Sequence, residues 1–89
     1  MLRLTVAAAD HLNTILTSKS APKRTAIRII KGDSGHFEIQ ADVPKMGDIS
    51  FEHEGRTVLV IDKKVSELLG DRVLDLVSRP EGTILALSP

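Results

Sequence analysis

The feature that most constrains the fold is a pair of alternating apolar segments separated by a short loop with two glycines. The segments are TAIRIIK (residues 25–31) and FEIQADV (residues 37–43). Such alternation predicts strands with one apolar face, and a slip of one residue would turn that face away from the core. A five-residue loop, residues 32–36, matches the two faces and predicts a hairpin. The cross-strand pairs that it predicts are Ile29 with Ile39 and Ile27 with Ala41.

A second hairpin is predicted further along the chain. DISFEH (residues 48–53) and TVLVID (residues 57–62) alternate in the same way, and EGR connects them. Gly55 can take the positive φ that a short connection requires. The predicted cross-strand pairs are Ile49 with Ile61 and Phe51 with Leu59. Val58 and Val60 would then point to the other side of the sheet, where their burial requires a helix, another strand or a second subunit.

Two helices are predicted around these strands. Residues 5–19, TVAAADHLNTILTSK, follow a helical period with Thr5 as the N-cap, and KKVSELL has Asp62 as its N-cap and Gly70 at its end. The apolar stripe of the first helix comprises Val6, Ala9, Leu12, Ile15 and Leu16. RVLDLV and TILALS predict two final strands. The order of elements indicates one small α+β domain over residues 1–89, with mostly antiparallel strands, an N-terminal helix and a second short helix.

Composition narrows the possible functions. Twelve basic residues balance twelve acidic ones, so the net charge gives no reason to expect nucleic acid or a membrane surface as a partner. No apolar run approaches the roughly 20 residues of a membrane span, and Asp10 and His11 interrupt any secretory signal, so we expect a cytoplasmic protein. The absence of cysteine excludes disulfides, nucleophilic thiols and cysteine-ligated clusters. Because so small a domain buries only about 60% of its unfolded surface, a homodimer is compatible with this composition.

The loop GDSGH, residues 32–36, is the first candidate site. Asp33, Ser34 and His36 are nearly consecutive, and neighbours in a turn point away from one another instead of forming a catalytic relay. The loop also leads into a strand, and Lys31 is not followed by the hydroxyl of a phosphate-binding loop. We therefore expect no catalytic residues and no enzyme activity.

A metal site could draw on Asp33, His36, His53 and Asp62. The predicted registers place His53 opposite Phe37 on the core side, whereas His36 lies in the loop on the polar side, so the two histidines would not converge. We interpret His53 as a strand-end histidine with a hydrogen-bond partner and His36 as a solvated residue. A further acidic residue, Asp75, lies between two leucines and is interpreted as a partnered carboxylate at a sheet edge.

The order of these motifs resembles the HesB/IscA-like A-type iron-sulfur carriers. LTVAAADHLNTIL is similar to the first helix of that family, and TAIRIIKGDSGHFEIQAD to its strand, loop and strand, in which the loop typically reads serine-glycine-cysteine-serine-glycine. DISFEHEGRTVLVIDKKVSELLGDRVLDLV is similar to its hairpin, Asp-capped helix and following strand, and EGTILALSP to its closing strand. The resemblance extends from about Leu4 to Pro89 and rests on element order and hydrophobic positions.

The resemblance also defines what this chain lacks. The family binds its cluster through one cysteine in the loop and two in a Cys-Gly-Cys tail. The loop cysteine corresponds to Asp33, and the tail pair has no counterpart because the sequence ends at Pro89. One carboxylate is a poor replacement for three thiolates.

The resemblance therefore implies a divergent, non-enzymatic member that binds no cluster or other cofactor and has an accessory, protein-interaction role in cluster assembly, with an unknown protein partner. The alternative is a mononuclear divalent-metal (iron) binding or sensing protein that uses Asp33 and His36.

Overall fold

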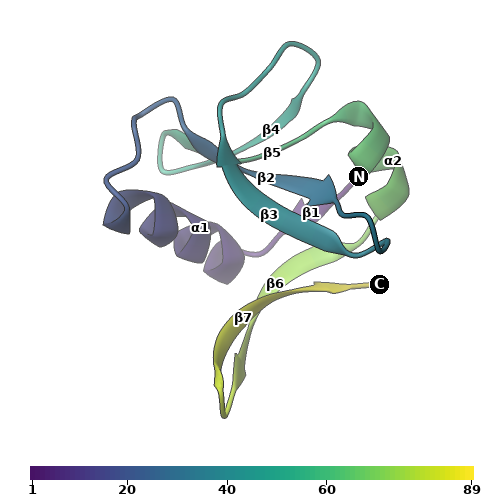
Figure 1. Ribbon diagram of the computed structural model, residues 1–89. Helices are drawn as coiled ribbons and strands as arrows, with labels where there is room; N and C mark the ends of the chain where they lie inside the picture. Colours follow the sequence, from purple (N-terminus) through teal and green to yellow (C-terminus); the bar gives the residue numbers. More distant parts are fainter.

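The computed structural model describes residues 1–89, which form two helices and seven strands (Figure 1). The elements in chain order are β1 (Arg3–Leu4), α1 (Val6–Ser18), β2 (Ala26–Lys31), β3 (Phe37–Asp42), β4 (Ile49–His53), β5 (Arg56–Ile61), α2 (Lys63–Leu69), β6 (Val73–Arg79) and β7 (Gly82–Ser88). The α+β class and the order of the longer elements are confirmed. Strand β1 was not predicted, because two residues are too few to show a period.

The strands form two sheets, with orders β3-β2-β5-β4 and β1-β6-β7. The predicted cross-strand pairs are confirmed in both hairpins, with Ile29 paired to Ile39 and Phe51 paired to Leu59. The second hairpin shifts register after Phe51, and its connection is two residues long because Arg56 already belongs to β5. The hairpins join through parallel pairing of β2 with β5, and β1 pairs in parallel with β6. The sequence did not predict these parallel pairs, because the alternation within a strand defines its faces and not its neighbours.

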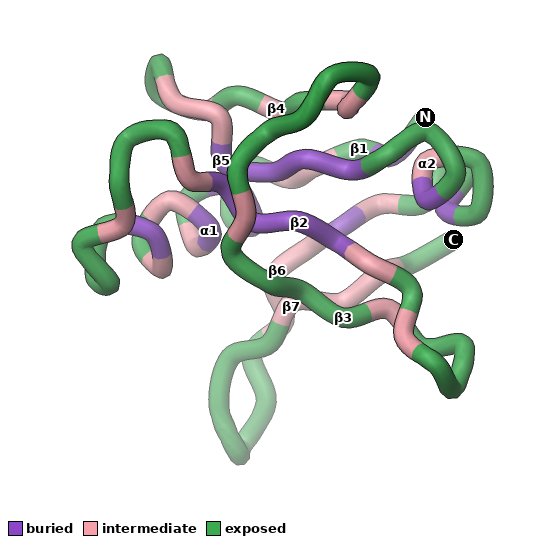
Figure 2. Tube along the Cα trace, turned by 45° about the horizontal axis from the view of Figure 1, so that its top comes forward, coloured by how far each residue is buried: buried purple, intermediate pink, exposed green.

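The hydrophobic core is one cluster to which α1, β2, β5 and α2 contribute most of the buried residues, and β6 contributes Leu74. Buried residues are concentrated on β2, on β5 and on part of α1, whereas β3 and the tip of the β6–β7 hairpin are exposed (Figure 2). Leu12 and Leu16 of the predicted stripe are fully buried, as is Ala8. Val6 is exposed, which corrects the predicted stripe at its first position, because this residue lines an open groove beside β4.

A β-bulge corrects the prediction for Val58. Phe51 pairs with Leu59 and the next residue, Glu52, pairs with Thr57, so Val58 is the extra residue of β5. Val58 belongs to the same buried cluster as Leu59 and does not share the opposite face with Val60. Val60 does lie on that face, beside Arg28 of β2, and is fully buried there.

Both predicted N-caps are confirmed. The Thr5 hydroxyl accepts a hydrogen bond from the Ala8 amide at 3.1 Å, and the Asp62 carboxylate accepts one from the Val65 amide at 2.7 Å. These bonds satisfy amides that have no partner within their helix. Neither helix is both long enough and apolar enough to cross a membrane.

Candidate functional site

The GDSGH loop has the predicted five residues and is closed by its backbone. The Gly32 amide donates to the His36 carbonyl at 2.7 Å, and the Gly35 amide donates to the Gly32 carbonyl at 3.1 Å. Gly35 has a φ of 83°, which a residue with a side chain rarely adopts. Asp33, Ser34 and His36 are all exposed. The loop shape therefore does not depend on interactions of these side chains.

Asp33 and His36 do not belong to any group of three ligand-type side chains within reach of one ion. Asp62, which was considered with them, caps α2 through its bond to the Val65 amide. The metal-binding role of Asp33 and His36 thus stays a prediction that names two ligands, and the loop supplies no third ligand.

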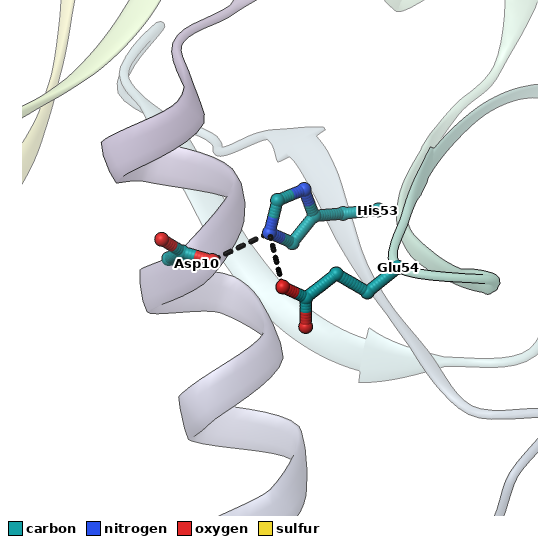
Figure 3. A group of neighbouring side chains, drawn as sticks. All are labelled: Asp10, His53 and Glu54. Carbon is teal, nitrogen blue, oxygen red and sulfur yellow. Dashed lines mark hydrogen bonds and ion pairs between the residues drawn. The ribbon is translucent and has the colours of Figure 1, made fainter.

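Ligand-type side chains converge elsewhere, in a group that we name the His53 cluster: Asp10, His53 and Glu54 (Figure 3). One oxygen or nitrogen from each lies within 4.8 Å of the others. His53 Nε2 is 2.5 Å from Asp10 Oδ1 and 3.9 Å from Glu54 Oε1. The second ring nitrogen points away from both carboxylates in Figure 3. The interpretation of His53 as a strand-end histidine with a hydrogen-bond partner is confirmed.

The position of His53 corrects the predicted pairing with Phe37. His53 pairs with Arg56 at the start of β5, whereas Phe37 pairs with Lys31 at the end of β2. Because β2 and β5 run parallel, the start of one and the end of the other lie at opposite ends of the sheet. The two histidines His36 and His53 are therefore well separated, and α1 is what approaches His53.

A tight turn places Glu54 in the His53 cluster. Glu54 and Gly55 connect β4 to β5 with φ angles of 52° and 76°, the arrangement of a two-residue type I′ turn. Asparagine and glycine are the residues that favour this conformation, and a glutamate there is strained. The turn directs the Glu54 carboxylate toward the imidazole of His53 (Figure 3).

The His53 cluster carries more negative than positive charge. The His53 side chain is 17% exposed, whereas those of Asp10 and Glu54 are 59% and 69% exposed. Neither carboxylate forms an ion pair with lysine or arginine. Arg56, the cross-strand neighbour of His53, donates instead to the carbonyls of Pro22 and Thr25. Two carboxylates thus share a single imidazole.

An open groove of about 650 Å³ lies beside this cluster. Residues 2–6 and Ala9 form one wall, and residues 50–53 form the other. His53 belongs to the second wall, so solvent and small solutes reach the edge of the imidazole through the groove.

A second polar group, which we name the Arg28 cluster, consists of Arg28, Asp42 and Asp48. The guanidinium donates to Asp42 at 2.8 Å and to the two oxygens of Asp48 at 3.1 and 2.5 Å, and it also donates to the Val43 carbonyl at 3.2 Å. The side chains of Arg28 and Asp48 are 7% and 5% exposed. These bonds tie the segment between β3 and β4 across the face of the sheet that carries Val60.

The turn at the tip of this segment is also held by Asp48. The Lys45 amide donates to the Asp48 carboxylate at 2.7 Å, and the Asp48 amide donates to the Lys45 carbonyl at 3.0 Å. Gly47 takes a φ of 89° within this turn, and Met46 projects into solvent with its full surface exposed.

The Arg28 cluster shifts the ionisation of its members. The hydrogen bond from the Arg28 guanidinium lowers the pKa of the Asp48 carboxyl below its usual range, against an opposing effect of burial. The Val43 amide, and after it Arg28, lower the pKa of the Asp42 carboxyl. The hydrogen bond to Asp48 raises the pKa of Arg28. All three groups are therefore charged at neutral pH, as a structural ion-pair network requires.

Asp75 is partnered as predicted, although its strand is not at a sheet edge. Its carboxylate accepts hydrogen bonds from the Thr5 hydroxyl and the Leu76 amide, both at 2.8 Å. Strand β6 lies between β1 and β7. The edge strand on that side is β1, which the sequence did not predict. Asp75 thus connects the start of α1 to the three-stranded sheet.

Comparison with known proteins rests on structure, because the sequence matches no protein-family model and no curated protein. SufA of Escherichia coli, involved in biosynthesis of iron-sulfur clusters, is similar with a TM-score of 0.79 and 22% identity, over 98% of this chain and 83% of that chain. IscA in a structure with a [2Fe-2S] cluster gives a TM-score of 0.68 and 21% identity, over 99% and 84% of the two chains. A protein from Aquifex aeolicus solved by NMR gives 0.66 and 20%, over 99% and 90%.

One of these neighbours is involved in biosynthesis of iron-sulfur clusters and another contains a [2Fe-2S] cluster, and each likeness extends over nearly all of this chain. The sequence identities are too low to show more than a shared architecture, and no cysteine is present among the 89 residues. The chain has the fold of the HesB/IscA family.

Proposed function

We propose that the protein is a non-enzymatic accessory component of iron-sulfur cluster assembly in the cytoplasm, which acts through protein contacts and binds no cluster. The observation that carries this proposal is the combination of the SufA-like and IscA-like fold over nearly the whole chain with the absence of every thiolate. Clusters of this class are held by cysteine sulfur. An exposed carboxylate at Asp33 does not fit that requirement.

Anaerobic reconstitution tests the absence of a cluster. The purified protein is incubated with ferrous iron and sulfide, desalted, and examined by visible absorption and by iron and sulfide analysis. Because the chain has no tryptophan, tyrosine or cysteine, protein absorption will not obscure a cluster. We expect no retained sulfide, with IscA as the positive control. A stoichiometric, sulfide-containing chromophore would refute this part of the proposal.

Strand β3 is the surface that we propose for protein contacts. It is an edge strand of the four-stranded sheet, so one side of its backbone has no strand partner. Ile39, at its centre, is 50% exposed and lines two apolar grooves, of about 270 and 410 Å³. An exposed apolar residue between apolar grooves on an unpaired edge is suited to pairing with another strand.

A second copy of this chain is the partner that we propose for β3. The net charge is zero, so two copies do not repel each other through long-range electrostatics. Light scattering after gel filtration should give twice the 9.7 kDa chain mass, and Ile39→Lys should give a monomer that still folds, because Ile39 is half-exposed. A wild-type monomer at high concentration would exclude this homodimer.

A transfer assay tests the accessory role. [2Fe-2S]-loaded IscA donates its cluster to an apo acceptor, and the transfer rate is measured with and without an excess of this protein. We expect the rate to change, and the monomeric Ile39→Lys variant tests whether the change requires the dimer. An unchanged rate with the folded wild-type protein would contradict an accessory role at this step.

A further inference from the structure

We propose that the His53 cluster is a binding site for one first-row divalent cation such as Zn²⁺ or Fe²⁺. The ligands are His53 Nε2 and one carboxylate oxygen each from Asp10 and Glu54, with the remaining positions open to water. This site lies at the opposite end of the four-stranded sheet from the GDSGH loop, and it does not depend on the cluster-assembly role.

Geometry is the first support. The three ligand atoms already lie within 4.8 Å of one another. Metal bonds of about 2.0 to 2.2 Å place neighbouring ligand atoms roughly 3 Å apart, so an ion between them needs only small side-chain movements. Asp10 and Glu54 are exposed and have the freedom to make these movements, whereas His53 is mostly buried and fixed by its strand.

The arrangement of donors is the second support. The nitrogen that faces both carboxylates is Nε2, and the other ring nitrogen points away from them (Figure 3). In the hydrogen bond with Asp10, Nε2 supplies the proton, because an ionised carboxylate only accepts. A cation would take the place of that proton and bind the imidazole together with both oxygens. One imidazole and two carboxylates are ligands suited to Zn²⁺, Fe²⁺ and Mn²⁺.

Charge is the third support. Asp10 and Glu54 bring two negative charges to one imidazole, and their only ion-pair partner is His53. The guanidinium of Arg56, the nearest candidate to neutralise them on β5, is bonded to the Pro22 and Thr25 carbonyls. A divalent cation would balance both charges. The three residues also come from two separate elements, α1 and the β4–β5 hairpin, so a bound ion would connect these elements.

Titration of the untagged protein with ZnCl₂, ferrous salt or MnCl₂ tests the site by calorimetry. We expect one ion per chain, with affinity in the order Zn²⁺, Fe²⁺, Mn²⁺. His53→Ala, Asp10→Asn and Glu54→Asn should each weaken Zn²⁺ binding by about tenfold or more. His11→Ala, next to Asp10, and the loop variants Asp33→Ala and His36→Ala are the matched controls and should bind as the wild type does.

Glu54→Asn separates ligation from folding. Asparagine suits the turn conformation better than glutamate, so this variant should be at least as stable as the wild type while it loses Zn²⁺ affinity. Mn²⁺ broadening of the amide NMR signals locates the ion without mutation and should centre on residues 10, 53 and 54. Absence of saturable binding, unaltered affinity in Glu54→Asn, or broadening centred on residues 33–36 would each overturn the proposal.

Discussion

The Arg28 cluster and the His53 cluster each bring two carboxylates to one nitrogen-containing side chain, but they differ in burial and in charge. Arg28 is buried and donates four hydrogen bonds, to two aspartates and one carbonyl. His53 has a single nitrogen facing Asp10 and Glu54, which are both exposed. The guanidinium keeps its charge and its protons, whereas an imidazole nitrogen can exchange a proton for a metal.

This difference makes the Arg28 cluster a structural ion-pair network, whereas the His53 cluster can still bind a ligand. In the Arg28 cluster each nitrogen of the guanidinium donates to an oxygen, and the bonds hold the segment between β3 and β4 over the sheet. In the His53 cluster two carboxylates have one donor between them. Because these two exposed carboxylates have only one hydrogen-bond donor between them, their oxygens can still bind a ligand. The predictions below test whether the first cluster serves stability and the second does not.

The largest expected effect is at Asp48. Asp48→Ala leaves the buried Arg28 guanidinium with two fewer bonds and frees the Lys45 amide. We expect a loss of about 2 to 3 kcal/mol in the free energy of unfolding, measured by urea titration. Glu81→Ala, at an exposed turn, is the control and should have no measurable effect. If both variants unfold at the same urea concentration, the Arg28 cluster is not the stabilising one.

The second largest effect is expected from acid, which should lower the free energy of unfolding that the Arg28 cluster contributes. The pKa values of Asp42 and Asp48 are lowered in the folded protein, so the stability that they contribute is present above the ordinary carboxyl pKa of about 4. It is lost as the pH falls below that value. Urea titrations at pH 7, 5 and 3 should show a steeper loss between pH 5 and 3 for the wild type than for Asp48→Ala. Parallel curves would assign the acid sensitivity to other groups.

A smaller effect of opposite sign is expected at Glu54. Glu54→Asn relieves a left-handed backbone conformation and should raise the free energy of unfolding by about 0.5 to 1 kcal/mol without metal. The contact that it removes, at 3.9 Å from His53 Nε2, is long and exposed. Destabilisation in metal-free buffer would mean that the His53 cluster stabilises the fold after all.

The smallest effect is expected in the GDSGH loop. Asp33→Ala should leave the unfolding midpoint unchanged, because the loop is closed by the bonds between Gly32, Gly35 and His36 in its backbone. Thermal melting followed by circular dichroism measures this. A clear loss of stability would show that the Asp33 side chain has a partner, such as a second subunit.

Alternation was sufficient to predict both hairpins and the pairs Ile29 with Ile39 and Phe51 with Leu59, because a slip of one residue in the first hairpin would have placed Arg28 opposite Ile39. It could not predict the bulge at Val58, since either face of β5 accepts a valine. Alternation also could not predict the parallel pairing of β2 with β5. Without that pairing, the end of the sheet that carries His53 could not be identified.

The His53 cluster was missed for the same reason. Asp10 and His53 are 43 positions apart, and nothing in either segment indicates that α1 crosses the end of β4. The sequence suggested Asp33, His36 and Asp62 as further ligands beside His53, and Asp10 and Glu54 were not among them. The Arg28 cluster did leave a signal, because an arginine within an otherwise apolar strand requires acidic partners, and Asp42 and Asp48 follow closely in the sequence.

The turn at Met46 is a suitable position for a label with which distances in this protein can be measured. Its base is held by the Arg28 cluster, its tip faces solvent, and no native thiol competes for a reagent. Met46→Cys would therefore place one spin label or fluorophore per chain at a well-defined position. Distances between labelled copies, and between the label and Mn²⁺, would report both association and the location of the ion from a single preparation.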